Sequence, residues 1–469
     1  MSSRDKLVEE MKYKLILMIP GSRKILVSQT SNSHCLPWVR IPTGTRIARE
    51  LQRAVMEIWK LDVIVLDLSN PEGVGGFLYA VAEVRPSKTP FGLRAIDIAE
   101  LKGIGLNKKL RGRLASVSQG EVLAESFFSR IGWISQSIAW VETETGKKTS
   151  SKSQIEQYNA GRNFSLIRFR MEDESEYWLK ATGEPNTHEM AVTYLLSKLA
   201  EGFLPRVIST RPAWNAWLMS GESASSRELQ TDPFQLLGNA VESMAALQFK
   251  TIGHRSSLLA VGAFDQSMTV FQQHSETVFD FLEAVMLSPM SSKAAPLDVL
   301  RLRELRRIFE DTIRRMEDLD LPQTVVHGDM NRANILAGSG QCQFLDWCEA
   351  YVGCPFITLQ HLLLLNQDGS EGWASRNAAL KDRYRRVWLR ACNAAVINKG
   401  FVYMQLLAIA STLYGRCNWF TSSARENLRR QTYALNLVQH LDRAARSPEL
   451  LDALRCRAMP GMVHVGAAT

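Results

Sequence analysis

A loop rich in polar side chains interrupts the C-terminal half of this chain, which is otherwise helical in pattern from about Asp232 onward. The apolar run Val325–Val326 leads into Asp329, and Asn334 follows five residues later. A second short apolar run then ends at Asp346. Short apolar runs bounded by turn-forming residues are typical of buried strands. The pattern therefore predicts two strands inside a helical region, each of which presents a carboxylate to a loop.

These three polar residues suit phosphoryl transfer from a nucleotide. Such a reaction needs an acid that accepts or orients the proton of the attacking hydroxyl, and oxygen ligands that hold Mg²⁺ on the phosphates. Asp329 suits the role of catalytic base, and Asn334 and Asp346 supply a neutral and an anionic oxygen for the metal. Mg²⁺ typically takes only one or two carboxylates together with phosphate and water oxygens, so this set is sufficient.

The segment His327-Gly328-Asp329 with Asn334, followed by Asp346-Trp347, resembles the motif of the aminoglycoside phosphotransferase and choline-kinase-like family. The resemblance covers roughly residues 153–451. It implies an α+β, protein-kinase-like fold of two lobes, with a small β-rich N-lobe and a helical C-lobe. It also implies an enzyme with ATP and Mg²⁺ as cofactors, which moves the γ-phosphate to a hydroxyl of a small molecule.

The same resemblance assigns residues of the N-lobe to nucleotide binding. Lys180 ends an apolar run, where the family has its phosphate-binding lysine, and Glu189 opens the next helix, where its paired acid is expected. The gap of nine residues between them is shorter than the family leads us to expect. Met219 and Gly221 fall where backbone groups meet the adenine edge. The segment 159–164 takes the place of the phosphate-covering loop but has a single glycine.

The chain departs from the family pattern after Asp346. Gly353 and Pro355 match, but Thr358 stands where the family has an aspartate that supports the catalytic loop. Thr358 can form a hydrogen bond but carries no charge. We interpret His327 as a structural residue that holds the loop. Glu349 is either an acid near the metal or an ordinary surface glutamate.

The N-terminal part, up to about residue 115, resembles a degenerate Nudix box around the predicted helix Arg46–Lys60. Aligned on Arg53, the box retains Glu57, and its other helix carboxylates are replaced. A Nudix site stacks several carboxylates to hold metal ions, and one carboxylate does not suffice. The expectation is a small Nudix-like α/β domain without hydrolase chemistry. An unrelated amphipathic helix is the alternative.

The remaining pattern completes a three-part organisation, with a Nudix-like domain at 1–115, a kinase-like N-lobe at 116–230 and a helical C-lobe with the catalytic loop at 231–469. Residues 187–199 are predicted to form a helix, and the polar stretch 142–152 a loop. Short apolar runs predict strands at 14–20, 24–29, 62–68, 77–84, 164–170, 176–181, 206–209 and 216–219.

Charge is concentrated in the last part of the chain. The net charge is +8, and from Asp368 onward fifteen Lys or Arg face seven Asp or Glu. A site for polycationic aminoglycosides would need several carboxylates instead. We therefore expect a neutral or anionic small-molecule acceptor. The C-lobe arginines behind this expectation are Arg383, Arg385, Arg386, Arg390, Arg416, Arg425, Arg429 and Arg430.

Other partners and compartments are less favoured by the sequence. No like-charge run or basic stripe interleaved with aromatic residues occurs, so nucleic acid is not expected as a partner. No run of about 18 apolar residues predicts a membrane span, and no secretory leader is recognised. The seven cysteines match no zinc spacing, which favours reduced thiols and a cytoplasmic location.

Two other functions are open to such a chain. One is a catalytically weak, kinase-like regulatory protein that binds a nucleotide or metabolite. Retention of Asp329, Asn334, Asp346 and Lys180 argues against it, because inactive kinases usually lose one of these groups. The other is a Nudix hydrolase with a kinase-like appendage, and the missing carboxylates argue against that.

Overall fold

The computed structural model divides the chain into two compact units, which are described separately. The first unit comprises Met1–Met190 and Pro205–Glu222, and the second comprises Ala191–Leu204 and Ser223–Thr469. The predicted boundaries near residues 115 and 230 lie outside the described residues, so the three-part division stays a prediction. The structure describes residues 10–30, 33–69, 76–85, 92–100, 127–150, 155–161, 163–221, 232–287, 296–338, 340–367, 369, 371–415 and 428–455.

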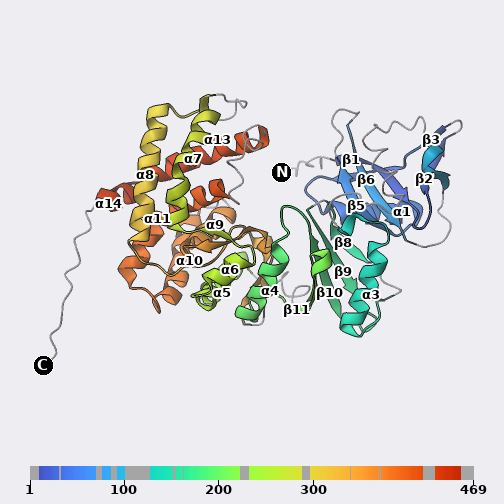
Figure 1. Cartoon of the computed structure of the whole chain (residues 1–469), viewed down its shortest axis with the longest axis horizontal. Coiled ribbons are helices and arrows are strands. Elements are labelled where there is room, and N and C mark those ends of the chain that lie inside the picture. The colour runs from blue at the N-terminus through green and yellow to red at the C-terminus, as the bar shows by residue number, and fades with distance from the viewer. Residues whose placement is uncertain are drawn as a thin grey trace, which may run out of the picture. The chain divides into compact units, whose positions relative to one another are not determined.

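The first unit begins with a mixed sheet of seven strands over its described residues (Figure 1). The strand order is β3-β2-β1-β6-β5, with β4 paired to β1 and β7 to β2, and β1 and β6 run parallel. Helix α1 (Ile47–Trp59) buries Leu51 and Val55 against one face. The strands are β1 (Glu10–Met18), β2 (Lys24–Thr30), β3 (Ser33–Cys35), β4 (Trp38–Pro42), β5 (Val63–Ser69), β6 (Phe77–Val84) and β7 (Leu93–Asp97).

A second sheet in this unit is antiparallel, in the order β11-β12-β10-β9-β8. Its strand β9 alternates buried and half-buried side chains, as a strand with one covered face should. The predicted strands and the hairpin around residues 171–174 are confirmed. The strands are β8 (Glu156–Asn159), β9 (Phe164–Arg170), β10 (Glu176–Thr182), β11 (Val207–Arg211) and β12 (Ala216–Ser220).

Helix α3 (Trp133–Thr145) corrects the predicted polar loop at 142–152. The helix continues through the first residues of that stretch and ends at Gly146, whose φ of 68° suits a left-handed helix cap. Its buried residues Trp133, Ile134, Trp140 and Val141 recur at helical spacing. That spacing was the sequence signal that could have predicted the helix.

The two sheets of the first unit share one hydrophobic core. Ile16 and Val27 of the first sheet belong to the same buried cluster as Trp133 and Trp140 of α3 and Ile167 of the second sheet. Successive strand residues point to opposite faces, so β1 contributes to this shared core with one set of side chains and to the α1 core with the other. The N-terminal region is thus packed onto the β-rich region that follows it.

The second unit is mainly helical (Figure 1). Asp232 and Asp298 cap two of its helices, each accepting a hydrogen bond from a backbone N–H in the first turn. The helices are α4 (Glu189–Leu199), α5 (Pro233–Thr251), α6 (Arg255–Ala260), α7 (Met268–Leu287), α8 (Val299–Glu317), α9 (Phe356–Leu365), α10 (Trp373–Trp388), α11 (Ala394–Tyr414), α13 (Leu428–Ala445) and α14 (Pro448–Arg455); the first residues of α4 belong to the other unit.

Short strands carry the predicted polar loop within these helices. Three strands form the sheet β13-β17-β14, and β15 pairs with β16. The predicted interruption of the helical region therefore extends beyond Asp346, and a further short strand precedes α7. The strands are β13 (Phe264–Gln266), β14 (Thr324–His327), β15 (Ile335–Ala337), β16 (Cys342–Phe344) and β17 (Ala350–Gly353).

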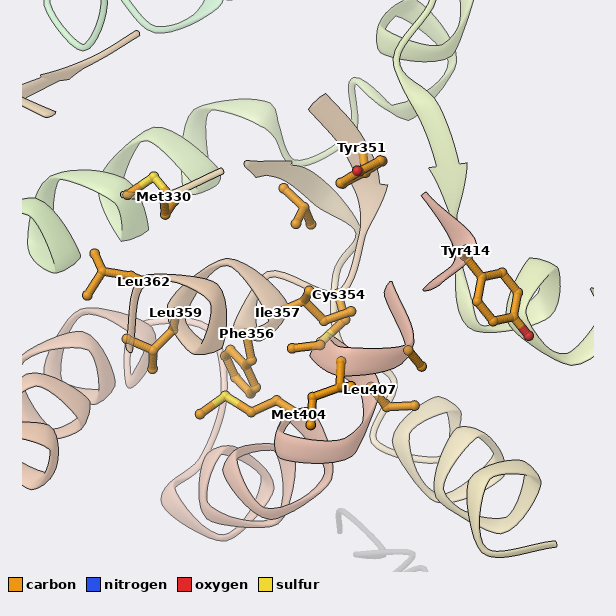
Figure 2. Close-up of a cluster of buried hydrophobic side chains, with 14 of the residues drawn as sticks. Met330, Tyr351, Cys354, Phe356, Ile357, Leu359, Leu362, Met404, Leu407 and Tyr414 are labelled. Carbon is orange, nitrogen blue, oxygen red and sulfur yellow. The ribbon is translucent and has the colours of Figure 1, made fainter. Parts of the chain in front are cut away.

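The core of this unit reaches up to the polar loop. Met330, next to Asp329, is fully buried in the same cluster as Phe356 of α9 and Met404 of α11 (Figure 2). Helix α11 is apolar enough to span a membrane, with a mean hydropathy of 1.3, but 61% of that window is buried inside the protein. Its residues fill the core, so we identify α11 as a core helix.

The predicted α+β class, with a β-rich N-terminal part and a helical C-terminal part, is confirmed. The likeness of the first sheet and α1 to a Nudix domain stays a prediction.

Candidate active site

Two asparagines fix the carboxylate of Asp329. The loop after β14 turns through the short helix Arg332–Asn334, which places both amides beside it. Asn331 Nδ2 donates to Asp329 Oδ1 at 2.7 Å, and Asn334 Nδ2 donates to Asp329 Oδ2 at 3.0 Å and to its carbonyl oxygen at 2.9 Å. Both carboxylate oxygens thus accept hydrogen bonds from neutral donors. This arrangement holds the group in one orientation, as a general base requires. Asn331 was not among the predicted site residues.

His327 joins this loop to the segment that carries Asp346. The backbone N–H of Asp329 donates to His327 Nδ1 at 3.2 Å, and His327 Nε2 lies 2.8 Å from the carbonyl oxygen of Leu345. Since Nδ1 accepts, the proton is on Nε2, which donates to Leu345. The ring is fully buried and packs on Trp347, with ring centroids 4.6 Å apart. This geometry agrees with the structural role we assigned to His327.

Thr358 supports the start of the loop through a hydrogen bond to the backbone of His327. Its Oγ1 accepts a hydrogen bond from the backbone N–H of His327 at 3.1 Å, and the side chain is buried. A buried amide without a partner is costly, so this one bond stabilises the start of the loop. The expected hydrogen bond of Thr358 is therefore present without the charge.

A second buried histidine, His361 of α9, adds no positive charge near the loop. Burial, and then the neighbouring His327, lower the pKa of His361 to about 4. His361 is therefore neutral at physiological pH.

Asn334 and Asp346 are brought together by the strand pair that lies between them in the sequence. Asn334 directly precedes β15, Asp346 closely follows β16, and Leu345 N–H donates to the Asn334 carbonyl oxygen at 2.9 Å. Asp346 has a φ of 62°, a left-handed conformation that is costly for an L-residue and often marks functional positions. Because Asn334 Nδ2 is turned to Asp329, its Oδ1 points the other way. One carboxylate and one amide oxygen are a donor set that fits Mg²⁺.

Lys180 and Glu189 form a buried ion pair in the first unit. Lys180 Nζ lies 2.5 Å from Glu189 Oε1, with the two side chains 9% and 1% exposed. The lysine comes from β10 and the glutamate from the first turn of α4. Phe164 and Trp217 flank the ammonium at 5.4 and 5.7 Å from their ring centroids. The expected pair is therefore present despite the short gap in sequence, and its role in binding phosphates stays a prediction.

The segment expected to meet adenine is the end of β12. Met219 pairs with Trp178 of β10, and Gly221 N–H donates to the Glu176 carbonyl oxygen at 2.8 Å. A Cβ at Gly221 would lie 2.8 Å from that same oxygen, so only glycine fits here. In this structure the amide of Gly221 is therefore already used within the sheet. Contact of Met219 and Gly221 with adenine stays a prediction.

Two further contacts that the sequence did not reveal hold the catalytic loop. Asn366, at the end of α9, donates from Nδ2 to the Met330 carbonyl oxygen at 2.8 Å. Gly328 N–H donates to the Glu349 carbonyl oxygen at 2.9 Å, and a Cβ on Gly328 would collide with Tyr351. The backbone of Glu349 therefore supports the loop.

Comparison with known families places this loop in a recognised domain. Residues 221–392 match the sequence model of the Phosphotransferase enzyme family, APH. This part of the chain is a phosphotransferase-family domain. It includes Asp329, Asn334, Asp346 and Thr358, while Lys180 and Glu189 precede it. The predicted family and the prediction of a phosphotransferase are confirmed at this level.

Solved structures resemble the chain more distantly, and no curated protein matches it. A macrolide 2'-phosphotransferase, MphH, from Brachybacterium faecium is 15% identical, with a TM-score of 0.41, over 68% of this chain and 97% of that one. A choline/ethanolamine kinase family protein from Mesorhizobium loti is 16% identical, with a TM-score of 0.43, over 67% and 97%. With TM-scores this low, the family assignment rests on the sequence match of residues 221–392 alone.

Proposed function

We propose that this protein is an ATP- and Mg²⁺-dependent phosphotransferase that moves the γ-phosphate of ATP to a hydroxyl of a small molecule. The observation that carries the proposal is the fixed carboxylate of Asp329, held through both oxygens by Asn331 and Asn334. Phosphoryl transfer depends mainly on positioning and charge stabilisation, so a preoriented base beside metal-binding oxygens is what it requires. The family of residues 221–392 supports the same chemistry.

Each predicted residue has a role in this reaction. Asp329 orients the acceptor hydroxyl and takes up its proton. Asn334 and Asp346 would hold Mg²⁺, which when bound neutralises charge on the phosphates. Lys180, kept in place by Glu189, binds phosphate oxygens, and the backbone at Met219 and Gly221 receives adenine.

The acceptor is proposed to be neutral or anionic. Several arginines of α10 are already paired with acids, which reduces the positive charge that they offer to an anionic acceptor. Arg383 makes two hydrogen bonds to Glu242, and Arg385 lies 2.6 Å from Asp382. Locally compensated charge attracts an anion weakly, so among the two classes a neutral hydroxyl compound is favoured. Arg416 and Arg425 lie outside the described residues, as do the side chains of Arg429 and Arg430.

A cytoplasmic location, without nucleic-acid or membrane partners, is proposed together with this function. The described cysteines, Cys35, Cys342, Cys348, Cys354 and Cys392, are all free thiols, which suits a reducing compartment. ATP is abundant in the same compartment.

A catalytically weak regulatory protein is the second candidate, and Thr358 favours it because the supporting charge is absent. Turnover separates the two candidates. Purified protein with MgATP should convert a member of a small-molecule pool to a phosphate ester, detected by mass spectrometry together with ADP release. Side-by-side kinetics with a kanamycin-like aminoglycoside and with neutral sugars test the acceptor class. MgATP binding without any phosphorylated product across sugar, nucleoside, amino-alcohol and aminoglycoside pools would favour the regulatory alternative.

A further inference from the structure

Gln52 of α1 is buried where the two sheets of the first unit meet. Its side chain is 2% exposed. Nε2 donates to the carbonyl oxygens of Val63, at 2.8 Å, and Ile155, at 3.0 Å, while Oε1 accepts from Gln157 N–H at 2.8 Å. The side-chain amide of Gln52 thus bonds to strand β5 of the first sheet and to the start of strand β8 of the second sheet.

Gln157 of β8 makes the reciprocal connection. Its side chain is 1% exposed; Oε1 accepts from Val65 N–H at 2.7 Å, and Nε2 donates to the Val65 carbonyl oxygen at 2.8 Å. The side-chain amide therefore pairs with β5 as a neighbouring strand would. All these polar groups are buried, so removing either glutamine side chain leaves the backbone groups that it binds without a hydrogen-bond partner. The two glutamines therefore form one connected network.

The connection leads directly to the predicted phosphate-covering loop. The β8–β9 register shifts between Gln157 and Asn159, at the start of the turn. Ala160 in the turn packs against the hydrophobic core beneath α1. Phe164 begins β9 on the far side of the turn, and the Lys180 ammonium lies over its ring. Both ends of the turn are therefore tied to fixed structure, one to the N-terminal region and one to the lysine.

We propose that the N-terminal α/β region is a positioning element of the nucleotide site, and that Gln52 and Gln157 are the positioning residues through which it holds the β8–β9 turn over the phosphates. The proposal rests on the proposed function. It gives the N-terminal region a role in nucleotide binding that needs no metal site and no hydrolase chemistry of its own.

The test compares Gln52→Leu, which keeps the volume and removes the hydrogen bonds, with Val55→Ala, one turn away on α1. Val55 is buried in the α1 core and its side chain makes no hydrogen bond, so Val55→Ala removes core packing without removing the glutamine connection. Gln52→Asn, which is too short to span both strands, replaces Gln52→Leu if that variant does not fold. Hydrogen exchange of residues 155–166, the KM for MgATP, the KM for the acceptor and kcat are measured for each protein.

We expect the Gln52 variants to exchange faster at residues 155–166 and to raise the KM for MgATP about fivefold or more, a change of about 1 kcal/mol. The acceptor KM and kcat should change less than twofold, and Val55→Ala should leave the exchange of this segment and the KM for MgATP unchanged. The proposal is overturned if the Gln52 variants bind MgATP as tightly as wild type does. It is also overturned if Val55→Ala raises the KM for MgATP as much as the Gln52 variants do. If wild type itself binds no MgATP, the proposed function fails first and this role fails with it.

Discussion

At the scale of single residues, Asp329 is the position on which the proposed mechanism depends most directly. Asp329→Asn should lower kcat by about 10²–10⁴-fold, because the amide cannot accept the hydroxyl proton. The Kd of MgATP should change less than about threefold, since the residue acts on the acceptor. Steady-state kinetics and calorimetry give the two values. Near-wild-type turnover would show that another group is the base.

The two predicted metal ligands should differ in strength. Asp346→Ala should weaken the Mg²⁺ dependence of ATP binding more than Asn334→Ala, because it removes a charge next to the cation. A Mg²⁺ titration of ATP binding is the measurement. Asn331→Ala is the control, since among the described residues the Asn331 side chain bonds to Asp329 and to the backbone of Ala333. If both ligand variants behave like this control, the metal lies elsewhere.

The threonine at position 358 should matter for stability as well as for rate. Thr358→Val leaves the buried N–H of His327 without its acceptor, at a cost of about 1–3 kcal/mol in the free energy of unfolding. Thr358→Ser keeps the oxygen and should lose less than half of that. Denaturant unfolding checks both variants. A valine variant as stable as wild type would mean that the loop does not depend on this bond.

At the scale of elements, Glu83 of β6 is a buried acid at the start of α3. Its Oε2 accepts from Gly132 N–H at 2.7 Å. Desolvation raises the pKa of Glu83, against smaller lowering effects of the Gly132 bond and Arg85. A folded-state pKa above the unfolded value means that the folded state binds the proton more tightly. The contribution to stability is therefore present at low pH and lost as pH rises through the folded pKa.

Glu83→Gln should remove this pH dependence while keeping an oxygen for Gly132. We expect the variant to be more stable than wild type at pH 8, by about 1.4 kcal/mol for each unit of pKa shift, and the difference to shrink toward pH 4. Thermal unfolding of both proteins across this range is the test. A variant less stable than wild type at pH 8 would show that the charge at the helix start outweighs desolvation.

At the scale of the whole molecule, the N-terminal region should not hydrolyse nucleoside diphosphate derivatives. Glu57 is 68% exposed at its side chain and lies 3.9 Å from Arg53, so it is a surface ion-pair partner on α1. A single exposed carboxylate cannot organise several metal ions. Phosphate or nucleoside monophosphate release is assayed in wild type, Asp329→Asn and Glu57→Gln. Release that survives Asp329→Asn and disappears in Glu57→Gln would contradict this expectation.

The sequence by itself determined α1, the loop after β14 and most strands of the two large sheets, namely β1, β2, β5, β6, β9, β10, β11 and β12. The strands β3, β4, β7 and β8 were not predicted. These features are local: a short apolar run marks each of these strands, and the amide of Asn334 reaches Asp329 because it follows it by five residues. A chemical role could be predicted there because spacing alone brings the groups together.

Tertiary structure decided the contacts between distant segments. Gln52 and Gln157 are 105 residues apart, and nothing in either local pattern marks a glutamine as buried, since glutamine is usually exposed. The role of Thr358 likewise depends on a bond to His327 across 31 residues. Polar side chains become part of a core only when another segment supplies their hydrogen-bond partners, and the folded chain alone determines which segment that is.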